Sequence, residues 1–111
     1  MKREYLGEFE ELVLMAVAIL SEGAYGNSVV EELKNRVSRD AGLSAVHVTL
    51  YRLEDKGLVK SEMGGSTNER GGRRKRIFRI TSAGLAVLRQ SHETRMELIR
   101  LIPQLNLSRN A

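Results

Sequence analysis

The sequence predicts a mainly α-helical fold with one small β-hairpin, in the order helix, helix, helix, strand, strand, helix. Two observations carry this prediction. Apolar residues recur at three- and four-residue intervals through most of the chain, and this period changes to the alternation of strands after Gly57. The length of 111 residues fits one compact domain.

Two amphipathic helices are predicted in the first 40 residues. In residues 8–20 the apolar positions follow helical spacing, and acidic side chains occupy the first turn, where the helix dipole favours them. A turn at residues 23–26 separates this segment from a second helix over residues 27–38. Val29, Val30, Leu33 and Val37 form the apolar stripe of that second helix.

A third helix and a hairpin follow. Ser44 is a suitable N-cap for a helix that runs through Lys56, and Gly57 stands where a left-handed residue commonly ends a helix. Residues 58–63 and 76–80 are predicted to be antiparallel strands. The polar, glycine-rich segment between them is predicted to be the flexible tip of the hairpin.

A long last helix is predicted after Thr81, its expected N-cap, with apolar residues continuing as far as Pro103. Residues 104–111 are expected to form a frayed tail. The complete order of elements matches a winged helix-turn-helix domain, in which the hairpin is the wing and the third helix enters the DNA major groove. We therefore expect residues 1–80 to bind DNA and residues 81–111 to form a dimerisation helix and tail, packed together as one compact unit.

Composition and charge narrow the classes of function. The chain lacks cysteine, and no segment is apolar enough to cross a membrane or to act as a secretory signal, so the expected location is cytoplasmic. Residues 64–80 carry a net charge of +5, whereas the whole chain carries +4, so the remainder is close to neutral. A local basic segment of this kind indicates a polyanionic partner, and we expect double-stranded DNA.

The third helix contains the expected base-reading residues. Val46, Leu50 and Leu53 share one side and are predicted to be buried. The base-reading candidates lie on or beside the opposite side: Ser44, Ala45, His47, Val48, Tyr51 and Arg52. Arg52 could donate two hydrogen bonds to guanine, and Val48 could contact a thymine methyl group. The alternative is that such side chains are simply solvated.

Phosphate contacts are expected from the wing and from the start of the second helix. The candidates are Tyr25, Asn27, Arg73, Arg74, Lys75 and Arg76. Four consecutive cations repel one another unless a polyanion neutralises them. Because side chains alternate along a strand, only some of the four are expected to reach phosphates. The alternative is a charged strand that only aids solubility.

An enzyme is the rival class, and the sequence argues against it. His47 and His92, the only histidines, lie on different predicted helices and are interpreted as solvated. The adjacent glutamate pairs diverge on their helices, and the glycines near Arg73 do not precede a helix as a phosphate-binding loop requires. We expect no catalytic residues, no metal and no cofactor.

Four segments resemble the PadR family of transcriptional regulators: LGEFE at 6–10, GAYG at 23–26, RLEDKGLV at 52–59 and GGRRKRIFRITSAG at 71–84. Together they span nearly the whole chain in the family's order. In the third helix the family often has Thr-Leu-Tyr-Pro-x-Leu where this chain has AVHVTL at 45–50. The operator sequence therefore does not carry over from the family.

The resemblance implies a homodimeric repressor on a pseudo-palindromic operator, with the last helix packed against the first and last helices of its partner. The expected interface residues are Phe9, Leu12, Leu88, Met96, Ile99 and Ile102. Several of them would be too apolar for a free surface helix. Family members are often released from DNA by a small, usually aromatic molecule, but no residue here identifies such a ligand. A winged helix that binds an acidic protein surface instead of DNA remains the alternative.

Overall fold

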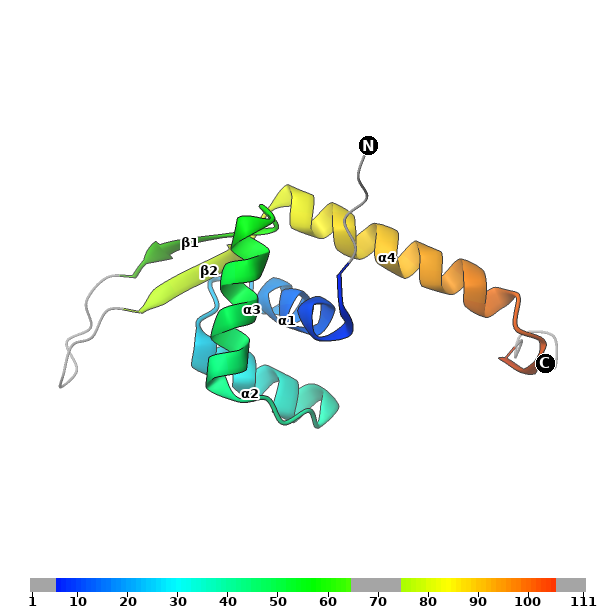
Figure 1. The fold of residues 1–111 in the computed structure, drawn as a ribbon, viewed down its shortest axis with the longest axis horizontal. Coiled ribbons are helices and arrows are strands. Elements are labelled where there is room, and N and C mark those ends of the chain that lie inside the picture. The colour runs from blue at the N-terminus through cyan, green and yellow to red at the C-terminus, as the bar shows by residue number, and fades with distance from the viewer. Residues whose placement is uncertain (1–5, 65–74, 106–111) are drawn as a thin grey trace.

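The computed structural model describes residues 6–64 and 75–105. The elements are α1 (Glu8–Ile19), α2 (Gly26–Val37), α3 (Leu43–Asp55), β1 (Val59–Met63), β2 (Arg76–Ile80), α4 (Ser82–Arg100) and the short 3-10 helix η1 (Pro103–Leu105). This is the predicted order, and the mainly helical winged fold is confirmed. The three helices α1 to α3 form a compact body, the hairpin projects from one side of it, and α4 extends well past the other side (Figure 1).

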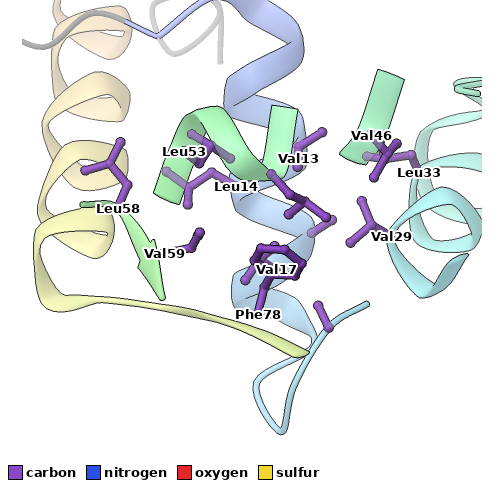
Figure 2. Close-up of a cluster of buried hydrophobic side chains, with 13 residues drawn as sticks. Val13, Leu14, Val17, Val29, Leu33, Val46, Leu53, Leu58, Val59 and Phe78 are labelled. Atoms are coloured by element: carbon purple, nitrogen blue, oxygen red, sulfur yellow. The ribbon is translucent and has the colours of Figure 1, made fainter. Parts of the chain in front are cut away.

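The core lies where α1, α2, α3 and the hairpin meet (Figure 2). Val46, Leu50 and Leu53 of α3 are fully buried, as the helical spacing predicts. On α1 the buried face differs from the simple stripe, because Leu14 and Val17 are fully buried whereas Ile19 is 54% exposed. The reason is the central position of α1, which contacts α2, α3, α4 and β2 and therefore has more than one covered side.

The hairpin is antiparallel, and its register pairs Val59 with Ile80, Ser61 with Phe78 and Met63 with Arg76. Ala24, which sequence reasoning assigned to a turn, pairs with Phe78 through two backbone hydrogen bonds of 2.7 and 2.9 Å. This isolated bridge attaches the segment before α2 to the wing. The base of the wing is thus held on both edges of β2.

Two helix boundaries follow local chemistry that the sequence predicts. Gly57 has φ +77°, the left-handed conformation expected after α3. The Thr81 hydroxyl accepts a hydrogen bond from the Gly84 N–H at 3.0 Å, so Thr81 is the N-cap of α4. At the other end α4 stops at Arg100, because Pro103 lacks an N–H and excludes the helical conformation of the residue before it.

The N-cap of α3 is a correction. Gly42 takes this position with extended backbone, and Ser44 lies inside the first turn of the helix, where its side chain is exposed. Glycine is tolerated as an N-cap, so the better capping chemistry of Ser44 does not decide the boundary. The shift by two residues places Ser44 on the outer surface of α3.

Candidate nucleic-acid interface

The outer face of α3 carries all the side chains predicted to read bases. Each of them is exposed: Ser44, Ala45, His47, Val48, Tyr51 and Arg52. The opposite face is anchored in the core by Val46, Leu50 and Leu53. A helix that is fixed on one side and exposes polar and small apolar groups on the other has the form needed to enter a DNA groove.

His47 connects α3 to the start of α2. Its imidazole lies directly against Gly26, so closely that a side chain at position 26 would overlap the Nε2 atom. The His47 ring also lies 6.4 Å from the Tyr51 ring, and Tyr51 lies 5.8 Å from Phe78 of β2, each pair nearly perpendicular. Such edge-to-face pairs restrict the orientation of the rings. The exposed side chains His47 and Tyr51 therefore have defined positions.

The start of α2 lies beside the base of the wing. The Tyr25 side chain makes no capping hydrogen bond to the helix, and the Ser28 hydroxyl bonds instead to the backbone N–H and carbonyl of Tyr25. The Lys75 ammonium lies 4.1 Å from the centre of the Tyr25 ring, within the range of a cation–π contact. Asn27 is exposed in the first turn of α2. Tyr25 and Lys75 are thus brought together, and exposed Asn27 lies two residues after Tyr25; all three remain candidates for phosphate contact.

The other wing cations differ in their surroundings. Arg76 is half-buried, and its Nη1 donates to the Ser61 hydroxyl at 2.9 Å, which in turn donates to the Glu54 carboxylate at 2.6 Å. Arg79 bonds to the Glu62 carboxylate at 3.0 Å and to the Glu22 carbonyl at 3.1 Å. Arg73 and Arg74 lie outside the described residues. The contacts of Ser61 and Glu54 were not anticipated, because no motif or spacing in the sequence links these two residues to Arg76.

The residues predicted to form a dimer interface fall into two groups. Phe9 and Leu12 of α1 and Leu88 of α4 are half-buried against the core of their own chain. Further along the chain, Met96 and Ile99 of α4 are 46% and 40% exposed, and Ile102 is 37% exposed just beyond the helix. Leu98 and Leu101, at 59% and 70%, add to this exposed apolar surface.

The first turn of α1 holds three acidic residues, and each binds a different element. Glu8 pairs with Arg39 after α2 at 3.0 Å, Glu10 pairs with Lys56 after α3 at 3.1 Å, and Glu11 pairs with Arg95 of α4 at 2.9 Å. Glu11 is buried and also accepts a hydrogen bond from the Ser91 hydroxyl at 2.6 Å. These contacts join the first turn of α1 to residues after α2, after α3 and within α4. The sequence predicts an acidic first turn but not these partners.

In two of these ion pairs the pKa of the carboxyl group is lowered. A hydrogen bond and the charge of Arg39 lower the pKa of Glu8, and Glu8 in turn raises the pKa of Arg39. Burial opposes ionisation of Glu10, but hydrogen bonds from the Gly7 N–H and the Lys56 ammonium, with the charges of Lys56 and Arg52, outweigh it and lower the pKa. Both carboxylates therefore favour the folded state when ionised.

No helix within residues 6–64 and 75–105 is both long and apolar enough to cross a lipid bilayer.

Comparison with known structures supports the class of protein that the geometry defines, a winged helix-turn-helix protein with a long C-terminal helix. A PadR family transcription regulator from hypervirulent Clostridium difficile matches with a TM-score of 0.72 and 18% identity, over 88% of this chain and 97% of that one. A PadR family transcriptional regulator from Eggerthella lenta matches with a TM-score of 0.69 and 27% identity, over 88% and 85% of the two chains. Bacillus subtilis PadR in complex with operator DNA matches with a TM-score of 0.63 and 15% identity, over 75% and 45%.

The family follows from the sequence match. The model of the transcriptional regulator PadR-like family matches residues 14–90, which include the second half of α1, all of α2 and α3, the wing and the first half of α4. No sequence among the curated proteins matches the chain significantly. This chain belongs to the PadR-like family of transcriptional regulators.

Proposed function

We propose that this regulator is a homodimeric repressor that binds a pseudo-palindromic operator, with α3 in the major groove and the wing along the phosphate backbone. The observation that carries this proposal is the joining of three surfaces through named contacts: His47 of α3 against Gly26 of α2, Tyr51 of α3 against Phe78 of β2, and Lys75 beside Tyr25. We infer from these contacts that the base-reading and phosphate-binding candidates belong to one DNA-binding surface.

The division of labour within this surface follows from chemistry. Exposed Arg52 and Tyr51 can reach base edges and so supply sequence discrimination. The first N–H groups of α2 have no partner within the helix, and with Asn27 and Lys75 they suit a phosphate oxygen. Arg73 and Arg74, which lie outside the described residues, would add further phosphate contacts from the wing. Phosphate contacts of this kind give affinity without discrimination.

The exposed apolar end of α4 supports dimerisation. Five large apolar side chains are exposed within residues 96–102, which is unusual for a surface helix, and a second copy of α4 with the outer side of α1 would cover them. We assign residues 1–80 to DNA binding and residues 81–111 to dimerisation. Two-fold symmetry in the protein requires matching symmetry in the operator. The proposed release by a small-molecule effector is tested by adding candidate ligands to a mobility-shift assay.

Selection of bound sites from a random duplex pool tests the main proposal, because it reports specificity, palindromy and half-site spacing together. We expect an enriched palindrome and an affinity that falls steeply as salt rises. Failure to bind any duplex at low salt would contradict the repressor proposal and favour a winged helix that contacts an acidic protein surface.

The Arg52→Ala variant tests the role of α3. We expect it to weaken binding to the selected duplex by roughly 10-fold, the size of one base contact, while binding to random duplex changes little. Equal losses on both duplexes would show that Arg52 does not read bases.

A further inference from the structure

A chain of polar side chains links the base of the wing to the end of α3. Ser61 of β1 stands in the middle, where its hydroxyl donates to Glu54 Oε2 at 2.6 Å and accepts from Arg76 Nη1 at 2.9 Å. Glu54 lies in the last turn of α3, and Arg76 is the first residue of β2. One hydroxyl therefore connects three elements, and both of its hydrogen-bonding roles are used.

These polar side chains lie on the same face of the wing as a second contact with α3, the pair Phe78–Tyr51. Ser61 is directly opposite Phe78, and paired residues in an antiparallel sheet point to the same side. Phe78 packs against Tyr51, which lies three residues before Glu54 in α3. The inner face of the wing is thus fastened to α3 at an aromatic pair and at the polar link Glu54–Ser61–Arg76.

We propose that Arg76 is a positioning residue, which holds the wing at a set angle to α3 through Ser61 and Glu54, in place of the phosphate contact expected from the sequence. This inference rests on the proposed DNA binding. Its consequence is that Arg76 acts on discrimination between duplexes, since α3 reads bases only when wing and helix meet the DNA in one relative position.

The surroundings of Arg76 favour this role over a phosphate contact. Its neighbour Lys75 is exposed, whereas Arg76, Ser61 and Glu54 are all half-buried. If the guanidinium moved to a phosphate, the Ser61 hydroxyl would lose its donor and the Glu54 carboxylate would lose the nearby positive charge. Partly buried polar groups that lose their partners cost free energy, which opposes this movement.

The test compares four single variants and the Ser61→Ala/Arg76→Gln double variant by their affinities for the selected duplex and for random duplex across a range of salt concentrations, below their melting temperatures. Ser61→Ala removes the link but keeps both charges, and Ser61→Thr keeps the hydroxyl. Arg76→Gln removes the cation, and Lys75→Gln is the matched loss of an exposed wing cation. The wild-type protein is the reference.

We expect Ser61→Ala and Arg76→Gln each to lower the ratio of selected to random affinity by roughly 5-fold, the size of one net hydrogen bond. The double variant should be no worse than either single one, because both remove the same link. Ser61→Thr should keep the wild-type ratio, which a general loss of stability would not explain. The slope of log affinity against log salt concentration on random duplex should become less steep only in Lys75→Gln. The expected change is about 0.9, the value for one phosphate contact.

A decrease of about 0.9 in the salt slope for Arg76→Gln, with an unchanged ratio for Ser61→Ala, would overturn the positioning role and leave the DNA-binding proposal intact. A ratio that falls in Ser61→Ala and is not preserved by Ser61→Thr would also overturn it. Absence of duplex binding by the wild-type protein would instead overturn both proposals.

Discussion

At the scale of single residues, the contact between Gly26 and His47 joins α2 to α3. His47 stands in the segment where the PadR pattern often has Tyr-Pro, and its ring occupies the space that a side chain at position 26 would need. The ring is also paired with Tyr51. Gly26 is therefore required by this neighbour, since its own backbone is ordinary helix.

Alanine usually stabilises a helix relative to glycine, but Gly26→Ala should destabilise this protein. The new methyl group would overlap the imidazole and approach Leu43 Cδ1 to 2.9 Å, so His47 must leave its position against Tyr51. We expect a decrease of about 1 kcal/mol in the free energy of unfolding, measured by urea denaturation, and weaker duplex binding.

The matched control is His47→Ala in the Gly26→Ala background. Removal of the imidazole creates room for the methyl group, so most of the lost stability should return. If the double variant is as unstable as Gly26→Ala alone, the contact with His47 is not the cause.

At the scale of elements, α4 has two different halves. Its first half is anchored by Thr81, by Gly84 against the Leu58 carbonyl, and by the contacts of Ser91 and Arg95 with Glu11. The side chains after Arg95 are exposed in this single chain. A helix with one anchored half and one exposed apolar half is well suited to bind a second copy.

A charge in the exposed half should therefore disrupt the proposed dimer. We expect Ile99→Glu, or Met96→Glu, to shift the protein toward monomer in sedimentation velocity and to weaken binding to the selected duplex by at least 10-fold, since burial of an unpaired carboxylate is costly. Ala86→Glu adds the same charge at an exposed position near the start of α4, away from this apolar end, and should leave the dimer intact. Monomeric wild-type protein at micromolar concentration would contradict the interface.

At the scale of the whole molecule, α1 is the centre of the structure. Its apolar side chains contact the core from several sides, and its acidic first turn binds residues after α2, after α3 and within α4. Loss of these charges should therefore loosen the arrangement of all the helices.

This arrangement predicts a dependence of stability on acid. The pKa values of Glu8 and Glu10 are lowered from 4.5 in the folded state, so their contribution is fully present above about pH 4.5 and is lost as the pH falls through the folded values. Urea denaturation from pH 7 to pH 3 should show this loss. Glu10→Gln should lower stability by roughly 1 kcal/mol at pH 7 and flatten the decline below pH 4.5.

The control for the acid response is Glu31→Gln, which removes an exposed carboxylate on α2 that has no ion pair among the described residues. Its pH profile should match the wild type. An unchanged profile in Glu10→Gln would show that the pair with Lys56 does not stabilise the fold.

The sequence by itself determined the order of the elements, the buried side of α3 and the outward position of its six base-reading candidates, because helical period, caps and glycine conformation act over a few residues. It also determined the local basic charge of the wing. What only the tertiary structure decided are contacts between residues distant in the chain: Gly26 with His47, Glu11 with Arg95, and Ser61 with both Glu54 and Arg76. Contacts of this kind depend on how the helices and the wing are packed, and no local pattern encodes that packing.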